Sequence, residues 1–179
     1  SATPVSMEFG EGGVDDAEDA DVIIHEYNHA LQLSFTGMGA NSSERQNIEE
    51  GLADYFCVSY SKSINPFNFE NIFTWDGHNE YWAGREATSS KNYKNITFNS
   101  NPYQHSDLLV ACLLEIYDSL GRDKTDQLIW EAMFSLNPGT TMPQFAMATL
   151  RADDNLNGGA HKSAVKSAFV NYGILEGDI

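Results

Sequence analysis

Hydrophobic and polar positions follow a helical period near the start of the chain. Apolar residues recur there at intervals of three and four, namely Ala20, Ile23, Ile24, Tyr27, Ala30 and Leu31. The opposite side of the same helix carries Val22, His25, Glu26, His29 and Leu33. We predict an amphipathic helix here, with the first side packed against the core and the second side left free for chemistry.

Further helices are predicted along the chain. Ser42 or Ser43 can cap a second helix, which runs through Tyr60. A broadly apolar and therefore largely buried helix begins near Asp107 and stops at Gly121. Three amphipathic segments follow it, at residues 126–136, 142–153 and 161–172. Together these segments predict a mainly α domain.

Two regions lack a helical period. Alternating polar and apolar residues at 4–9 predict one short strand, which adds a small N-terminal β element and makes the fold class α+β. Residues 62–104 are rich in Asn and aromatic side chains and contain no helical period of any length. A segment of this kind beside a candidate site commonly wraps a cleft. Its aromatic residues, such as Trp75 and Trp82, either line that cleft or cover the core.

Length and composition predict one domain. A chain of 179 residues with 41% hydrophobic content is long enough for a single core. We divide it into an edge strand and acidic approach at 1–18, metal-binding helices at 19–61, cleft loops at 62–104 and a helical lobe at 105–179. Cys57 and Cys112 lie in apolar helical contexts, which favours buried thiols over the alternative, a disulfide bridge.

The charge balance excludes some partners. Ten Lys and Arg against 26 Asp and Glu give a net charge of −16, which repels phosphate backbones and argues against nucleic-acid binding. The longest apolar run, at residues 108–114, is too short to span a bilayer. The first residues show no basic segment followed by an apolar core, so no signal peptide is expected in this chain. We expect a monomer.

Candidate metal ligands stand in the first predicted helix. His25 and His29 are four residues apart, so both imidazoles lie on one face and can reach one metal ion. A catalytic zinc takes three protein ligands and keeps one open position for water, so a third ligand is needed. We expect Glu50 from the second helix, with Asp54 one turn later accepting the outward N–H of His25. Glu49 is the competing ligand, but it has no carboxylate one turn later.

Glu26 follows the first ligand directly and projects about a quarter turn away from it, so it cannot easily bind the same ion. A carboxylate in that position is suited to act as general base, which takes a proton from the attacking water and passes it to the leaving amine. The sequence therefore predicts metal-assisted hydrolysis with Glu26 as base.

Residues 21–30, together with Glu50-Gly51-Leu52-Ala53-Asp54, resemble the gluzincin pattern of zinc metallopeptidases, and the fungalysin family more than thermolysin itself. The resemblance implies a thermolysin-like catalytic domain that is secreted and cleaves peptide or protein substrates as an endopeptidase. Relatives carry a β lobe before the first histidine, so we expect this chain to be the C-terminal part of a larger catalytic domain.

The resemblance also implies a donor for the oxyanion, a histidine just before the buried helix. His105 stands there, with His78 as the alternative, and Tyr103 could replace the tyrosine that some relatives use. Two other functions stay open. An aminopeptidase of the same clan is suggested by residues 6–9, although Asp54 argues against it, and a zinc-bound but inactive interaction domain would keep the same ligands.

Calcium is a second candidate cofactor. Five carboxylates crowd the start of the first helix, namely Asp15, Asp16, Glu18, Asp19 and Asp21. The helix dipole favours acidic residues at this end, and a structural Ca²⁺ site would use the same oxygens. Residues 153–158 match half of a calcium loop, but Ala164 stands where the closing glutamate belongs, so we predict an ordinary helix stop there.

Overall fold

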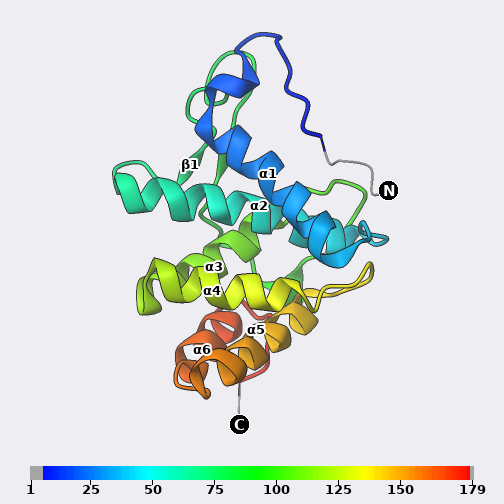
Figure 1. The fold of residues 1–179 in the computed structure, drawn as a ribbon, viewed down its shortest axis with the longest axis vertical. Helices are drawn as coiled ribbons and strands as arrows, with labels where there is room; N and C mark the ends of the chain where they lie inside the picture. The colour runs from blue at the N-terminus through cyan, green and yellow to red at the C-terminus, as the bar shows by residue number, and fades with distance from the viewer. Residues whose placement is uncertain (1–5, 178–179) are drawn as a thin grey trace.

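The computed structural model describes residues 6–177, which fold into a mainly helical domain (Figure 1). The helices of this part of the chain are α1 (Ala20–Thr36), α2 (Ser43–Ile64), α3 (Ser106–Leu120), α4 (Arg122–Met133), α5 (Met142–Asn157) and α6 (Lys162–Asn171). Two single 3-10 turns, η1 (Asp16–Glu18) and η2 (Tyr93–Asn95), and two short strands, β1 (Asn71–Ile72) and β2 (Arg85–Glu86), complete it.

The helices stack in three tiers along the long axis of the molecule (Figure 1). α1 and α2 lie at one end, α3 and α4 in the middle, and α5 and α6 at the other end. α2 packs against both α1 and α3, which makes it the link between the first tier and the core. Leu108, Leu109, Leu113 and Ile116 of α3 are fully buried, which confirms the prediction that this helix is largely buried.

Local signals set the helix ends. The Ser42 hydroxyl accepts a hydrogen bond from the Arg45 amide at the start of α2, which continues to Ile64, beyond the predicted end at Tyr60. α4 begins at Arg122, four residues before the predicted start, directly after α3 ends at Gly121. α5 continues to Asn157, four residues beyond the predicted end, and then stops at Gly158 in a left-handed conformation, so the predicted helix stop lies at the end of residues 153–158.

The β element differs from the prediction. Residues 4 and 5 of the expected N-terminal strand lie outside the described residues, and residues 6–9 are not in a strand. The two strands of the described chain lie within residues 62–104, as an antiparallel pair with Ile72 opposite Arg85. A strand exists only where a second one pairs with its backbone, and the sheet of the described residues contains β1 and β2 alone. Alternation in one segment could not reveal this.

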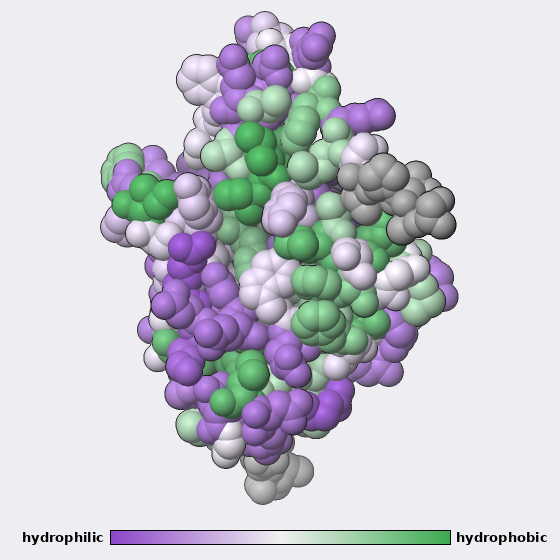
Figure 2. All heavy atoms as spheres, viewed as in Figure 1, coloured by the Kyte–Doolittle hydropathy of each residue, from purple (hydrophilic) through white to green (hydrophobic). Residues whose placement is uncertain are grey.

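The assignment of the two faces of α1 was wrong at most of its positions, although Ile24 is partly buried against the core as predicted. The side that contains Val22, His25 and Asn28 is buried, whereas Ile23 and Tyr27 on the expected packing side are 41% and 54% exposed. Figure 2 shows hydrophobic residues gathered on the outer surface where α1 runs. α1 packs on α2 through polar contacts, since Gln32 Nε2 donates to the Glu49 carbonyl oxygen, so the site-forming face is also the packed face.

Two further expectations concern cysteines and membranes. Cys57 and Cys112 are both buried and free, so the disulfide alternative is excluded. Across residues 6–177, we find no helix with both the length and the apolar content required to span a bilayer.

Candidate metal centre

Three side chains from α1 and α2 converge on one point. The Nε2 atoms of His25 and His29 are 3.0 Å apart, and Glu50 Oε2 lies 3.1 Å from the first and 3.4 Å from the second. Their ligand atoms all lie within 4.8 Å of one another, so this group could hold a metal ion. Among the described residues, no second group of three or more His, Cys, Asp or Glu side chains converges in this way.

The environment of Glu50 fits a cation at this point. Its Oε2 atom is buried and receives no hydrogen bond from residues 6–177, despite its proximity to the two imidazoles. A buried carboxylate oxygen without a donor is costly, and a metal ion among the three ligand atoms would remove that cost. Two imidazole nitrogens with one carboxylate oxygen are a ligand set that zinc commonly takes in catalytic sites.

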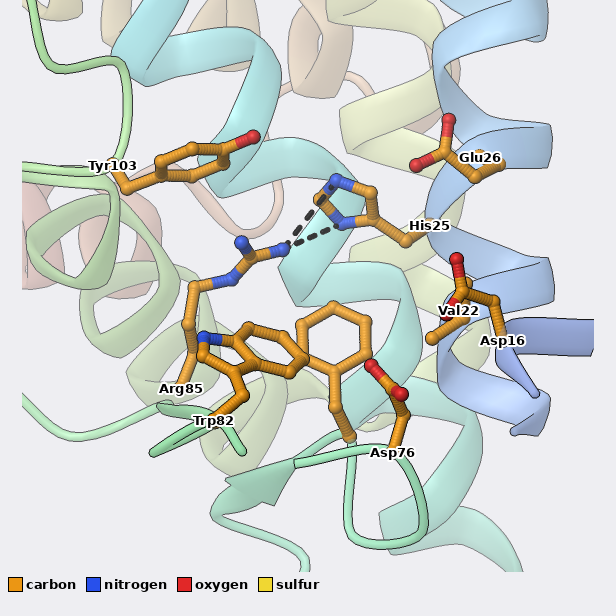
Figure 3. A pocket seen from close by; sticks show the side chains of 10 residues that line it. Asp16, Val22, His25, Glu26, Asp76, Trp82, Arg85 and Tyr103 are labelled. Atoms are coloured by element: carbon orange, nitrogen blue, oxygen red, sulfur yellow. Dashed lines mark hydrogen bonds between the residues drawn. The ribbon is translucent and has the colours of Figure 1, made fainter. Parts of the chain in front are cut away.

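A second carboxylate and a guanidinium stand behind His25. Asp54 Oδ1 lies 2.9 Å from His25 Nδ1, the place where the sequence predicted this carboxylate. The same oxygen accepts a hydrogen bond of 2.9 Å from Arg85 Nη2, which is also 3.3 Å from His25 Nδ1 (Figure 3). Asp54 is 2% exposed, so both contacts are shielded from water. This arrangement turns Nε2 of His25 toward Glu50 and His29.

The contacts perturb the acid–base properties of two ligands. Burial lowers the pKa of His25, but the contacts with Asp54 and Glu50 outweigh it and raise that pKa to about 9. Burial raises the pKa of Glu50, but His25 and His29 outweigh it and lower that pKa to about 2. The two shifts are mutual, since a protonated His25 and an ionised Glu50 favour each other, and a metal ion would take the place of that proton.

A cavity of about 520 Å³ opens beside His25, whereas His29 and Glu50 line a separate cavity of about 310 Å³. His25 and Glu26 line it from α1, and Trp82, Arg85 and Tyr103 line it from the loops of residues 62–104 (Figure 3). Trp82 thus belongs to the cavity wall, whereas Trp75 does not line it and is 59% exposed. The predicted base is therefore on the same cavity as the first ligand.

Two carboxylates at the start of α1 fix the loop that closes this cavity. Asp19 Oδ2 accepts hydrogen bonds from the Trp75 and Asp76 amides, and Asp21 Oδ2 accepts one from the Phe73 amide. Phe73 has a φ of 65°, which is strained for a bulky residue. Burial raises the pKa of Asp21, although the Phe73 amide lowers it. Backbone amides therefore account for part of the acidic cluster that was also considered for calcium.

The two histidines predicted for the oxyanion do not line the cavity. His105 is buried at the start of α3, where its Nε2 lies 3.3 Å from the Thr97 carbonyl oxygen and its ring packs edge-on against Phe98. His78 Nε2 lies 3.1 Å from the Ile72 carbonyl oxygen. Because both imidazoles are directed into neighbouring loops, the geometry favours neither residue for this role.

Tyr103 and Arg85 occupy the wall opposite Glu26 (Figure 3). The Arg85 guanidinium lies 4.5 Å from the ring centre of Phe73 and 4.7 Å from that of Tyr103. Burial, together with the negative charge of Glu50, raises the pKa of Tyr103. Arg85 was not predicted from the sequence, because its position beside Asp54 depends on the pairing of β2 with β1, which no periodicity indicated.

Comparisons with known proteins identify no family for this chain, so its function has to be argued from the geometry of the site. No protein-family model matches the chain, and no curated protein matches it.

Proposed function

We propose that this protein is a zinc-dependent peptidase in which His25, His29 and Glu50 bind the ion and Glu26 acts as general base. One observation carries the proposal: three ligand atoms converge, one of them a buried carboxylate oxygen that lacks a hydrogen bond, and the first ligand shares a cavity with Glu26. The resemblance of the two helical segments to gluzincins of the fungalysin type favours a secreted endopeptidase with a thermolysin-like catalytic domain.

When bound, zinc would acidify a water molecule and polarise the scissile carbonyl. The remaining steps belong to the chain. The Glu26 carboxylate takes one proton from the water as its oxygen bonds to the carbonyl carbon. The C–N bond then breaks, its electron pair stays on nitrogen, and Glu26 gives the proton to the departing amine. Asp54 holds the His25 ring in the required orientation throughout.

Metal content and proteolysis test the proposal together. We expect about one zinc per chain by mass spectrometry, and casein cleavage that a chelator abolishes and zinc restores. Glu26→Gln should retain zinc and lose at least ~10²-fold in kcat, since general acid–base catalysis contributes roughly 10²–10⁴-fold. Glu131→Gln in α4, outside the cavity lining, is the matched control.

Other results would select other functions. Zinc without cleavage of casein, but with release of N-terminal residues from short peptides, would indicate an aminopeptidase. Zinc without either activity would indicate an inactive interaction domain. A chain that binds no zinc after reconstitution would refute the metal site itself.

A further inference from the structure

We infer that the cavity beside His25 binds the positively charged side chain of a lysine or arginine in the substrate, and that Asp16 and Asp76 select this side chain. The selected residue is the one whose nitrogen leaves when the peptide bond breaks. The inference rests on the function proposed above, because it names the substrate class of that same site.

Two carboxylates in the cavity wall have no cationic partner. Asp16 and Asp76 line the cavity, and no Lys, Arg or His side chain within residues 6–177 forms an ion pair with either of them. The guanidinium in the same wall, that of Arg85, is already paired with Asp54. Partial burial raises the pKa of Asp76, and the negative charge of Asp16 raises it further. A cation in the cavity would offset this repulsion.

Backbone contacts hold both carboxylates in place. Asp19 is 3% exposed, and its Oδ2 atom accepts a hydrogen bond of 2.9 Å from the Asp76 amide. The Gly10 amide donates to Asp16 Oδ2 at 2.9 Å. Figure 3 shows Asp16 and Asp76 at the same end of the cavity, with Arg85 across from them. Within residues 6–177 the two carboxylates do not converge with a third His, Cys, Asp or Glu side chain, which favours an organic cation over a metal ion.

The groups beside these carboxylates suit the aliphatic part of a basic side chain. Val22, Phe73 and Trp82 line the same cavity, whose volume of about 520 Å³ is typical of ligand pockets. The ring centres of Phe73 and Trp82 are 5.1 Å apart. Aromatic faces attract cations, and long basic side chains lay their methylene groups on apolar surface while the charged end reaches polar groups. The cavity therefore offers a surface for both parts of a lysine or arginine.

The position of Glu26 identifies which substrate residue enters the cavity. Glu26 lines it and, in the proposed reaction, gives a proton to the departing amine. His29 and Glu50 line the separate cavity of about 310 Å³, so each cavity meets a different part of the metal centre. We assign the larger cavity to the residue that supplies the leaving nitrogen. Each cleavage should therefore create a new N-terminus that begins with lysine or arginine.

Matched peptides test this preference. They carry lysine, norleucine or glutamate directly after the cleaved bond and are otherwise identical. We expect kcat/KM for the lysine peptide to exceed that for the norleucine peptide at least ~10-fold, the effect of one charge-assisted hydrogen bond, and the glutamate peptide to be the poorest substrate. The assay runs at 500 mM salt, where attraction over long distances is screened. Mass spectrometry of casein fragments should find lysine or arginine at the new N-termini.

The double variant Asp16→Asn/Asp76→Asn should bring the lysine-to-norleucine ratio of kcat/KM close to one, with zinc content unchanged. Its asparagine Oδ1 can still accept the Gly10 amide, so the loop keeps this contact. The control is Asp118→Asn/Asp123→Asn, which removes two charges on α3 and α4, outside the cavity lining, and should keep the wild-type ratio. A lysine preference that survives in Asp16→Asn/Asp76→Asn would overturn the inference.

Peptide binding to the zinc-free protein separates this inference from the proposed function. By calorimetry, the lysine peptide should bind more tightly than the norleucine peptide, and Asp16→Asn/Asp76→Asn should abolish the difference. An active, zinc-bound protein that cleaves both peptides equally well, or that favours lysine on the carbonyl side of the bond, overturns the inference alone. A protein that binds no zinc and cleaves no peptide, yet binds the lysine peptide through these two aspartates, refutes the proposed function and leaves the cation site standing.

Discussion

Asp54 contacts two cationic partners with one oxygen, His25 at 2.9 Å and Arg85 at 2.9 Å. We expect Asp54→Asn to weaken zinc binding about 10- to 100-fold, because a neutral amide orients the imidazole poorly and no longer raises its basicity. Competition with a chromogenic chelator measures the zinc affinity. Asp118→Asn, which changes an exposed carboxylate paired with Lys62, should leave it unchanged. If Asp54→Asn bound zinc as tightly as Asp118→Asn, Asp54 would not contribute to metal binding.

The metal-free protein should lose stability as pH rises above neutrality. The pKa of His25 is about 9 in the folded state against 6.5 as its ordinary value, so its stabilising contribution is complete below pH 6.5 and disappears as pH approaches 9. A shift of this size corresponds to roughly 3 kcal/mol. The pKa of Glu50 is displaced downward to about 2, so its contribution is complete above pH 4.5 and disappears as pH falls toward 2.

Urea unfolding between pH 5 and 9.5 in the presence of a chelator measures this dependence. His25→Asn should flatten the alkaline slope, whereas His161→Asn, at the start of α6 and outside the metal centre, should keep it. With zinc present the trend should reverse, since the metal needs the neutral imidazole and binds more tightly as pH rises. An alkaline slope that survives in His25→Asn would contradict this account.

At the scale of elements, the approach of α2 to α3 determines where Glu50 sits. A Cβ atom on Gly51 would lie 3.0 Å from the Ser106 carbonyl oxygen and 3.2 Å from Leu109 Cβ. Gly51→Ala gains up to ~1 kcal/mol of helix propensity, but we expect the overlap to exceed it and lower the free energy of unfolding by about 1–2 kcal/mol. Zinc affinity should fall as well, because Glu50 moves with α2.

Urea unfolding and chelator competition on the same variant check both effects. Gly39→Ala is the control, since its Cβ would meet no atom within 4 Å. If Gly51→Ala were more stable than the wild type and kept its zinc affinity, the two helices would have room to separate without moving the site.

Some features of these elements could be predicted from the sequence and others could not. The ligand pairs were predictable because spacings of four residues within one helix are local geometry, and His25, His29 and Glu50 do converge. The buried face of α1 could not be predicted, because its burial depends on polar contacts with α2, such as the hydrogen bond from Gln32 to the Glu49 carbonyl oxygen. The contact of Arg85 with Asp54 could not be predicted either, because it depends on the pairing of two strands of two residues each.

At the scale of the whole molecule, the chain has a net charge of −16, and two of its aspartates, Asp16 and Asp76, line the cavity. A negative field of this extent attracts cations before contact and is screened by salt, with a Debye length of about 30 Å at 0.01 M and 8 Å at 0.15 M ionic strength. For the peptidase proposed here, cationic peptides should therefore associate faster than neutral ones at low salt.

The test compares two peptides that differ only in a lysine or a norleucine remote from the cleaved bond. At 10 mM salt we expect kcat/KM to be roughly 10-fold higher for the lysine peptide, with the ratio falling toward one at 500 mM while the norleucine peptide changes little. Long-range attraction predicts this loss with salt, because it acts across water. A local contact between the lysine and one buried carboxylate would persist at high salt, because buried pairs are screened much less. A ratio that stays constant from 10 to 500 mM would therefore assign any preference for lysine to the cavity rather than to the charge of the whole molecule.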